Sequence, residues 1–136
     1  MTLYLVFPLP PQRANARGHW AKTYRAQRAW TAAALHANPI LVRGLPPEER
    51  IAHAVLEATL VVSRAMDEDN AVARLKWALD ILRPRTRRPK GAHRSITLGG
   101  IIVDDDPDHL TILPVIQEVR PKRVDHRLLI TLTATP

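Results

Sequence analysis

The most regular pattern in the chain lies between residues 51 and 64, where apolar and polar side chains alternate. Because successive residues of a strand point to opposite faces, this period predicts a half-buried β-strand. The apolar face of that strand carries Leu56, Ala58, Leu60 and Val62. Residues 1–8 predict a first strand, and residues 100–103 predict a short one. The segments 110–119 and 127–134 predict a hairpin whose turn lies at residues 121–125.

Two further segments have helical character. Residues 19–37 combine many alanines with basic side chains, which predicts a helix with a basic face that ends at Asn38-Pro39. Between residues 69 and 82, apolar side chains recur at helical spacing, and Asp69 is a candidate N-cap. These apolar positions are Val72, Leu75, Leu79 and Leu82. Together with the strands, the pattern predicts a mixed α/β (α+β) fold: one small domain over residues 1–136, with a mixed sheet packed against two main helices.

Three segments predict loops. Residues 8–18 are rich in proline and polar side chains, and residues 44–49 read as a surface loop. Residues 83–94 contain two prolines, six positive charges and no acid. Prolines forbid a continued helix there, so an exposed, mobile loop is expected.

Composition narrows the class of protein. The chain is 46% hydrophobic and has no run near the roughly 18 apolar residues needed to span a bilayer. Its N-terminal segment has neither a positive flank nor a cleavage site of small residues, so we expect a cytoplasmic protein. Without cysteine, the chain has no disulfide, no thiolate ligand and no cysteine nucleophile.

The charge balance points to a polyanionic partner. The formal net charge is +7, and sixteen of the twenty basic residues are arginine. A positive field raises the local concentration of phosphates, and the guanidinium fork matches phosphate oxygens. Nucleic acid is therefore the expected partner.

The acids, by contrast, are concentrated. Seven of the thirteen acidic residues lie in two runs, residues 67–69 and 104–108, and each run follows an expected strand. Neighbouring carboxylates repel one another unless a cation or a basic group offsets the repulsion. Carboxylate oxygens are ligands for hard cations such as Mg²⁺, so the two runs predict a metal site.

Plainer explanations exist for each feature alone. Taken alone, the first run is more commonly explained by a solvated turn with a helix N-cap. The second run, taken alone, is explained by an ordinary acidic turn. Lys76 could balance an acidic site or stabilise charge on a phosphate, but Asp80 lies four residues later and offers an ordinary helical ion pair. The histidines His19 and His109 are more often structural than ligating. The three tryptophans are more often core than base-stacking platforms, and they are Trp20, Trp30 and Trp77.

Three motifs taken together resemble the RusA family of Holliday junction resolvases, small nucleases common in bacteriophages and prophages. The first is Asp67-x-Asp69-Asn70 and the second is Leu75-Lys76-x-x-x-Asp80-x-Leu82. The third is Gly100-x-x-x-Asp104-Asp105-Asp106-Pro107-x-His109. The opening Phe7-Pro8-Leu9-Pro10-Pro11, with Asn15 and His19-Trp20 after it, is also similar to the family.

The resemblance implies a homodimer that binds four-way DNA junctions in a bacterial cell and cuts them symmetrically by phosphodiester hydrolysis in recombination and repair. It implies Mg²⁺, with Mn²⁺ as a substitute, held by Asp67, Asp69 and an aspartate of the second run. Asp105 is favoured for that role, with Asp104 beside it. Lys76 matches the family's lysine and would join the aspartates in catalysis. Asn70 would support the site by hydrogen bonding.

Two basic segments are expected to contact DNA. In the opening segment the expected contacts are Arg13, Asn15, Arg17 and His19. The second segment is a basic insert at about residues 83–98, where its arginines could neutralise backbone phosphates. Its expected contacts are Arg83, Arg85, Arg87, Arg88, Lys90 and Arg94. Three alternatives stay open: a non-catalytic DNA-binding protein, a metal nuclease for flapped or single-stranded DNA, and a cation-stabilised structural protein.

Overall fold

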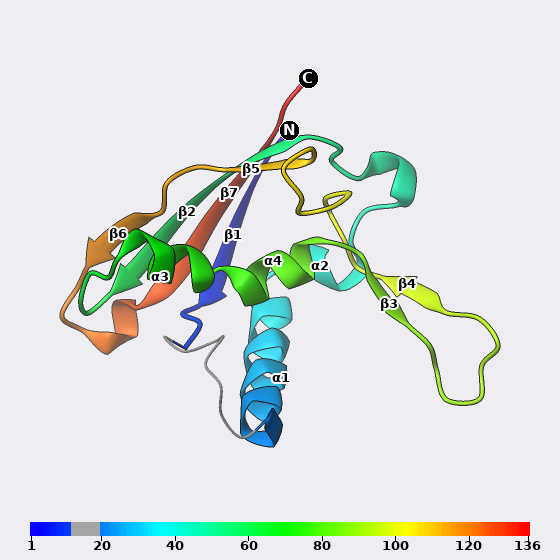
Figure 1. Ribbon diagram of the computed structural model, residues 1–136, viewed down its shortest axis with the longest axis horizontal. Helices are drawn as coiled ribbons and strands as arrows, with labels where there is room; N and C mark the ends of the chain where they lie inside the picture. Colours follow the sequence, from blue (N-terminus) through cyan, green and yellow to red (C-terminus); the bar gives the residue numbers. More distant parts are fainter. Residues whose placement is uncertain (12–19) are drawn as a thin grey trace.

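A five-stranded mixed sheet forms the centre of the molecule in the computed structural model, which describes residues 1–11 and 20–136 (Figure 1). The side chains of Trp20, Arg87, Ile96 and Leu98 are also outside the description. The strand order is β1-β7-β2-β5, and β6 pairs with β2 as well. The bounds are β1 Thr2–Pro8, β2 Ala54–Val62, β5 Leu110–Ile112, β6 Ile116–Val119 and β7 Arg127–Ala134.

Strand β7 lies between β1 and β2 and is antiparallel to both, whereas β5 and β6 run parallel to β2. The predicted hairpin between residues 110–119 and 127–134 is therefore wrong. A strand with a neighbour on each edge can satisfy its backbone groups on both sides, and β7 also buries alternate side chains. Those buried side chains are Leu128, Ile130 and Leu132.

Helices cover one face of this sheet. Their bounds are α1 Trp20–Ala37, α2 Ile40–Arg43, α3 Glu68–Ala73 and α4 Lys76–Leu82, with short 3₁₀ turns at Pro47–Glu49 and Arg123–Asp125. The mixed α/β fold class is thus confirmed. The first helix ends before Asn38-Pro39 as predicted, and the predicted apolar face of β2 is buried.

Aromatic rings join the two main helical regions to the sheet. Trp30 of α1 stacks on Phe7 of β1 with ring centroids 5.8 Å apart, and Trp77 of α4 tilts against Trp30 at 5.8 Å. Both indoles are buried, as predicted. Asn38 is buried as well, and its amide nitrogen donates to the carbonyls of Val6 and Ala34. It thereby fixes the end of α1 against β1.

The segment after the first acidic run differs from the prediction. In place of one helix there are two, because the helical hydrogen-bond pattern tightens at Leu75, whose N–H donates to the carbonyl of Val72. The N-cap of α3 is Asp67, whose backbone is extended, and Asp69 lies inside the first turn. Leu75 is fully buried, whereas Val72 is exposed.

The predicted mobile loop at residues 83–94 contains part of a two-stranded hairpin instead. Strand β3 (Arg85–Arg87) pairs antiparallel with β4 (Ile96–Leu98), and Figure 1 shows the hairpin projecting from the body. The expected strand at residues 100–103 contributes one isolated bridge, Ile51 to Ile102. The hydrogen bond of Ile101 N–H to the carbonyl of Leu82 fixes this return segment to the end of α4.

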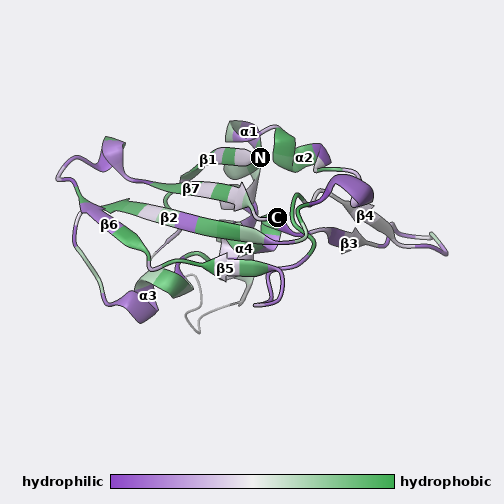
Figure 2. Ribbon diagram, turned by 90° about the horizontal axis from the view of Figure 1, so that it is seen from above, coloured by the Kyte–Doolittle hydropathy of each residue, from purple (hydrophilic) through white to green (hydrophobic). Residues whose placement is uncertain are grey.

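The other face of the sheet carries no helix in the described part of the chain. Figure 2 shows β1, β7 and β2 side by side with mixed hydropathy along each strand. The exposed residues on this face include Tyr4 and Val6 of β1 and Glu57 of β2. None of the described helices is long and apolar enough to cross a membrane.

Candidate functional site

The first acidic run follows the buried strand β2 and begins α3. Met66, the residue before this run, is held by two reciprocal hydrogen bonds with Gln117. Met66 N–H donates to Gln117 Oε1, and Gln117 Nε2 donates to the carbonyl of Met66, both at 2.7 Å. Glu68 Oε1 accepts a hydrogen bond from Val115 N–H at 2.9 Å. The middle acid of the run therefore has a structural role that the sequence did not predict.

The two aspartates that flank Glu68 are exposed. Asp67 makes no side-chain capping bond, and no ion pair in the described part of the chain involves Asp67 or Asp69. Asn70 and Lys76 are exposed too, on α3 and at the start of α4. The expected pair of Lys76 with Asp80 is absent from the described ion pairs, because Asp80 instead faces Arg83.

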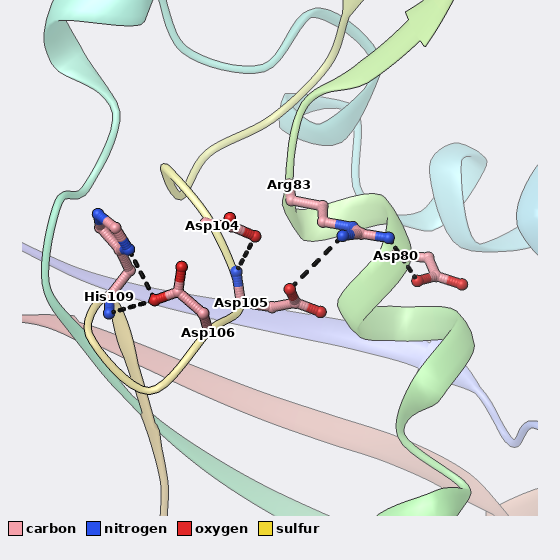
Figure 3. Close-up of polar contacts among 6 residues, drawn as sticks. All are labelled: Asp80, Arg83, Asp104, Asp105, Asp106 and His109. Atoms are coloured by element: carbon pink, nitrogen blue, oxygen red, sulfur yellow. Dashed lines mark hydrogen bonds and ion pairs between the residues drawn. The ribbon is translucent and has the colours of Figure 1, made fainter.

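The second acidic run is largely occupied by contacts with its own loop (Figure 3). Asp104 Oδ1 accepts a hydrogen bond from Asp105 N–H at 2.8 Å. Asp106 Oδ1 accepts from the backbone N–H groups of Asp108 and His109. It also contacts His109 Nδ1 at 2.8 Å. Asp104 and Asp106 thus serve as turn residues of the kind expected after a strand.

Asp105 is bound differently. Its carboxylate lies 3.6 Å from Arg83 Nη1, a loose ion pair, and Arg83 Nη2 is 3.4 Å from Asp80 Oδ1. Burial raises the pKa of Asp105, and a hydrogen bond with the Asp104 side chain raises it further, whereas Arg83 acts in the opposite direction. A carboxyl group that is costly to ionise is one that a bound cation would stabilise.

His109 and Asp106 form the tightest charged contact of this loop. The hydrogen bond between them raises the pKa of His109 and lowers that of Asp106. The His109 ring also stacks on His53 with centroids 6.0 Å apart, and His53 Nδ1 donates to the carbonyl of Asp108. Of the two histidines considered as ligands, His109 therefore has structural contacts, while His19 lies outside the described residues.

The structure does not bring the two acidic runs together. Asp67 is the N-cap of α3, whereas Asp105 contacts Arg83, the C-cap of α4. The two helices lie end to end (Figure 1). Within residues 1–11 and 20–136, no three acidic or histidine side chains converge as a metal-binding group. The donor chemistry of Asp67 and Asp69 nevertheless fits Mg²⁺, which is often held by one or two carboxylates with waters and substrate phosphates completing the shell.

A polar cleft of about 810 Å³ opens beside the first run. One side is the Leu9–Pro11 segment and another is the end of β2 with its connection to α3. Its charged or titratable lining residues are Arg64, Arg74, Arg123 and His126. Arg74 Nε donates to the carbonyl of Pro10 at 2.7 Å, and burial lowers the pKa of this guanidinium. The sequence did not predict these charged residues as one site because three separate segments contribute them.

The residues expected to contact DNA differ in their surroundings. Arg13, Asn15, Arg17 and His19 lie outside the described residues. In the hairpin segment, Arg83 is held by Asp80 and Asp105, and Arg85 Nε is buried without a hydrogen-bond partner among the described residues. Arg88 Nε donates to the carbonyl of Ala92. Arg88, Lys90 and Arg94 are exposed, and the side chain of Arg87 is outside the description.

Comparison with protein-family models, with curated proteins and with solved structures gives no match to this chain.

Proposed function

We propose that the protein is an Mg²⁺-dependent endodeoxyribonuclease, similar to the RusA family, that cuts four-way DNA junctions by paired phosphodiester hydrolysis as a homodimer. The observation that carries the proposal is the pair of exposed aspartates at the junction of β2 and α3. Asp67 and Asp69 have no ion-pair partner in the described part of the chain, although the net charge is +7. Such carboxylates are available to a ligand that comes from outside the fold.

Each residue has a role in this proposal. Asp67 and Asp69 hold the cation, and Asp105, whose carboxylate lies beside Arg83, is the aspartate of the second run that the resemblance to the RusA family favours. When bound, Mg²⁺ supplies a water of lowered pKa and positive charge beside the scissile phosphate. Lys76, exposed on α4, offers a further positive charge to the phosphate, and Asn70 offers hydrogen bonds. A homodimer presents two such sites to a junction that is itself two-fold symmetric.

The main rival is a DNA-binding protein without catalysis. The exposed hairpin residues Arg88, Lys90 and Arg94 and the net charge support either function equally. Cleavage separates the two, because only the nuclease needs the carboxylates. A nuclease for flapped or single-stranded DNA would use the same site on another substrate.

The decisive experiment uses a synthetic four-way junction beside duplex, flap and single-stranded DNA, each with Mg²⁺ and with EDTA. We expect symmetric paired cuts in the junction with Mg²⁺ and none with EDTA. Junction binding without cutting in Mg²⁺ or Mn²⁺ would contradict the proposal. Preferential cutting of the flap would instead assign the other substrate.

A further inference from the structure

The arginine-lined cleft beside the first acidic run has features of a binding site. It combines the side chains of Arg64, Arg74, Arg123 and His126 with the Leu9–Pro11 segment in a space of about 810 Å³. The positive charges are therefore collected in one concave place, and none of the described residues that line it is acidic.

Internal hydrogen bonds hold two of these groups in place. Arg74 Nε donates to the carbonyl of Pro10, and within residues 1–11 and 20–136 no hydrogen bond occupies the two terminal nitrogens of the guanidinium group. His126 Nε2 lies 2.9 Å from the carbonyl of Arg120. Because a carbonyl oxygen can only accept, Nε2 carries the proton in this contact. Arg74 and His126 are thus positioned by the fold before any ligand arrives.

Arg74 is also partly desolvated, which lowers its pKa through burial. A guanidinium that has lost part of its hydration gains more from an anion than a fully solvated one does. The exposed side chains of Arg64 and Arg123 come from the end of β2 and from the 3₁₀ turn before β7. They bring two further positive charges to the same opening.

The position of the cleft indicates what the anion is. Residues 62–66 line it, and Asp67 is the next residue along the chain. An anion in the cleft therefore lies next to the exposed carboxylates that begin α3. A free carboxylate ligand would gain little from this arrangement, whereas an extended polyanion could place one phosphate among the arginines and the next beside the acids.

We propose that this cleft binds the phosphodiester backbone of the DNA strand that is cut, immediately adjacent to the scissile phosphate. This inference rests on the proposed function for the identity of the strand. The binding itself depends on Arg64, Arg74 and Arg123 and not on the carboxylates, so it can be tested without cleavage.

The test measures junction binding by fluorescence anisotropy in EDTA over a range of salt concentrations. The variant Arg64→Gln with Arg123→Gln changes two exposed side chains, and the control Arg25→Gln with Arg43→Gln removes the same charge from α1 and α2. Each phosphate that a variant no longer neutralises lowers the slope of log K against log salt by about 0.7 to 0.9. We expect a fall of about one to two in the cleft variant and a smaller one in the control.

Equal slopes in the two variants would overturn the inference. A second arm adds inorganic phosphate at constant ionic strength. If free phosphate shifts the NMR signals of the terminal Nη–H groups of Arg74 and the cleft variant still binds DNA with the wild-type slope, the cleft is a site for free anions and the inference is wrong. Because every binding arm contains EDTA, an absence of cleavage would refute the proposed function without deciding this result.

Discussion

The two acidic runs have similar composition but opposite surroundings. In the second run, Asp104 and Asp106 accept hydrogen bonds from their own loop, and Arg83 lies beside Asp105. In the first run the middle acid, Glu68, is bound to Val115 N–H, while Asp67 and Asp69 face solvent. The same carboxyl groups thus shape a turn in one place and are left for a ligand in the other. Surroundings, and not local composition, separate the two roles.

The strongest test of this comparison removes the charge of the exposed pair. We expect Asp69→Asn, and equally Asp67→Asn, to lower junction cleavage by about 100-fold or more, because charge stabilisation at the reacting phosphate contributes several kcal/mol. The affinity for the junction in EDTA should stay within about two-fold of the wild-type value, because these carboxylates repel DNA and do not help to bind it. Glu57→Gln, on the outer sheet face, is the matched control. Full activity of Asp69→Asn would remove the first run from the site.

The second run offers a sharper contrast within itself. We expect Asp105→Asn to lower cleavage by about ten-fold or more and Asp104→Asn by less, because Asp104 already accepts a hydrogen bond from its own loop. The measurement is single-turnover cleavage across a range of Mg²⁺ concentrations. A loss that high Mg²⁺ relieves would assign Asp105 to metal binding, and a loss that persists would give it a role separate from the cation at Asp67 and Asp69. An effect of Asp104→Asn larger than that of Asp105→Asn would reverse the assignment.

The basic hairpin should contribute to affinity in proportion to its exposed charges. Replacing Arg88, Lys90 and Arg94 with glutamine should lower the salt slope of junction binding by about 0.9 for each phosphate that the hairpin no longer neutralises. Thr97→Ala is a control on the same hairpin that changes no charge. An unchanged slope in the triple variant would exclude the hairpin from the DNA interface.

The smallest expected effect is a pH dependence of the second run's loop. The pair His109 and Asp106 stabilises the fold while both are charged. For Asp106, whose pKa is lowered, the contribution is present above the ordinary value of 3.8 and is lost as the pH falls through the folded value. For His109, whose pKa is raised, it is present below 6.5 and is lost as the pH rises through the folded value.

NMR titration of the His109 ring without metal checks the direction of its pKa shift. The midpoint should lie above 6.5 in the wild type and move down in Asp106→Asn. A wild-type midpoint below 6.5 would contradict the ion pair.

Local patterns predicted the elements that local chemistry controls. The alternation of β2 placed Leu56, Ala58 and Leu60 in the core, and Asn38-Pro39 ended α1 where expected. The position of β7 could not be predicted in this way, because pairing with β1 or with β6 satisfies the same alternation. The break between α3 and α4, where Leu75 N–H donates to the carbonyl of Val72, is likewise not visible in the helical spacing of the apolar residues.

In the candidate site, too, local features could be predicted from the sequence and long-range arrangements could not. Sequence identified the two acidic runs, but their separation depends on how α3 and α4 lie end to end. The cleft was not predictable, because Pro10, Arg64, Arg74 and Arg123 come together only through the fold. The basic hairpin resembled a loop because β3 is only three residues long and contains no apolar side chain that could show alternation.

The central place of β7 also determines the order in which the molecule can assemble. Among the described strands, β1 and β2 are joined only through β7, so the sheet that supports the first acidic run is incomplete until residues 127–134 have left the ribosome. Contacts between such distant segments make folding slow, because the chain must close a long loop before those contacts form. In a growing chain, β1 therefore has no β7 to pair with until residues 127–134 have been synthesised, and the sheet is completed only then.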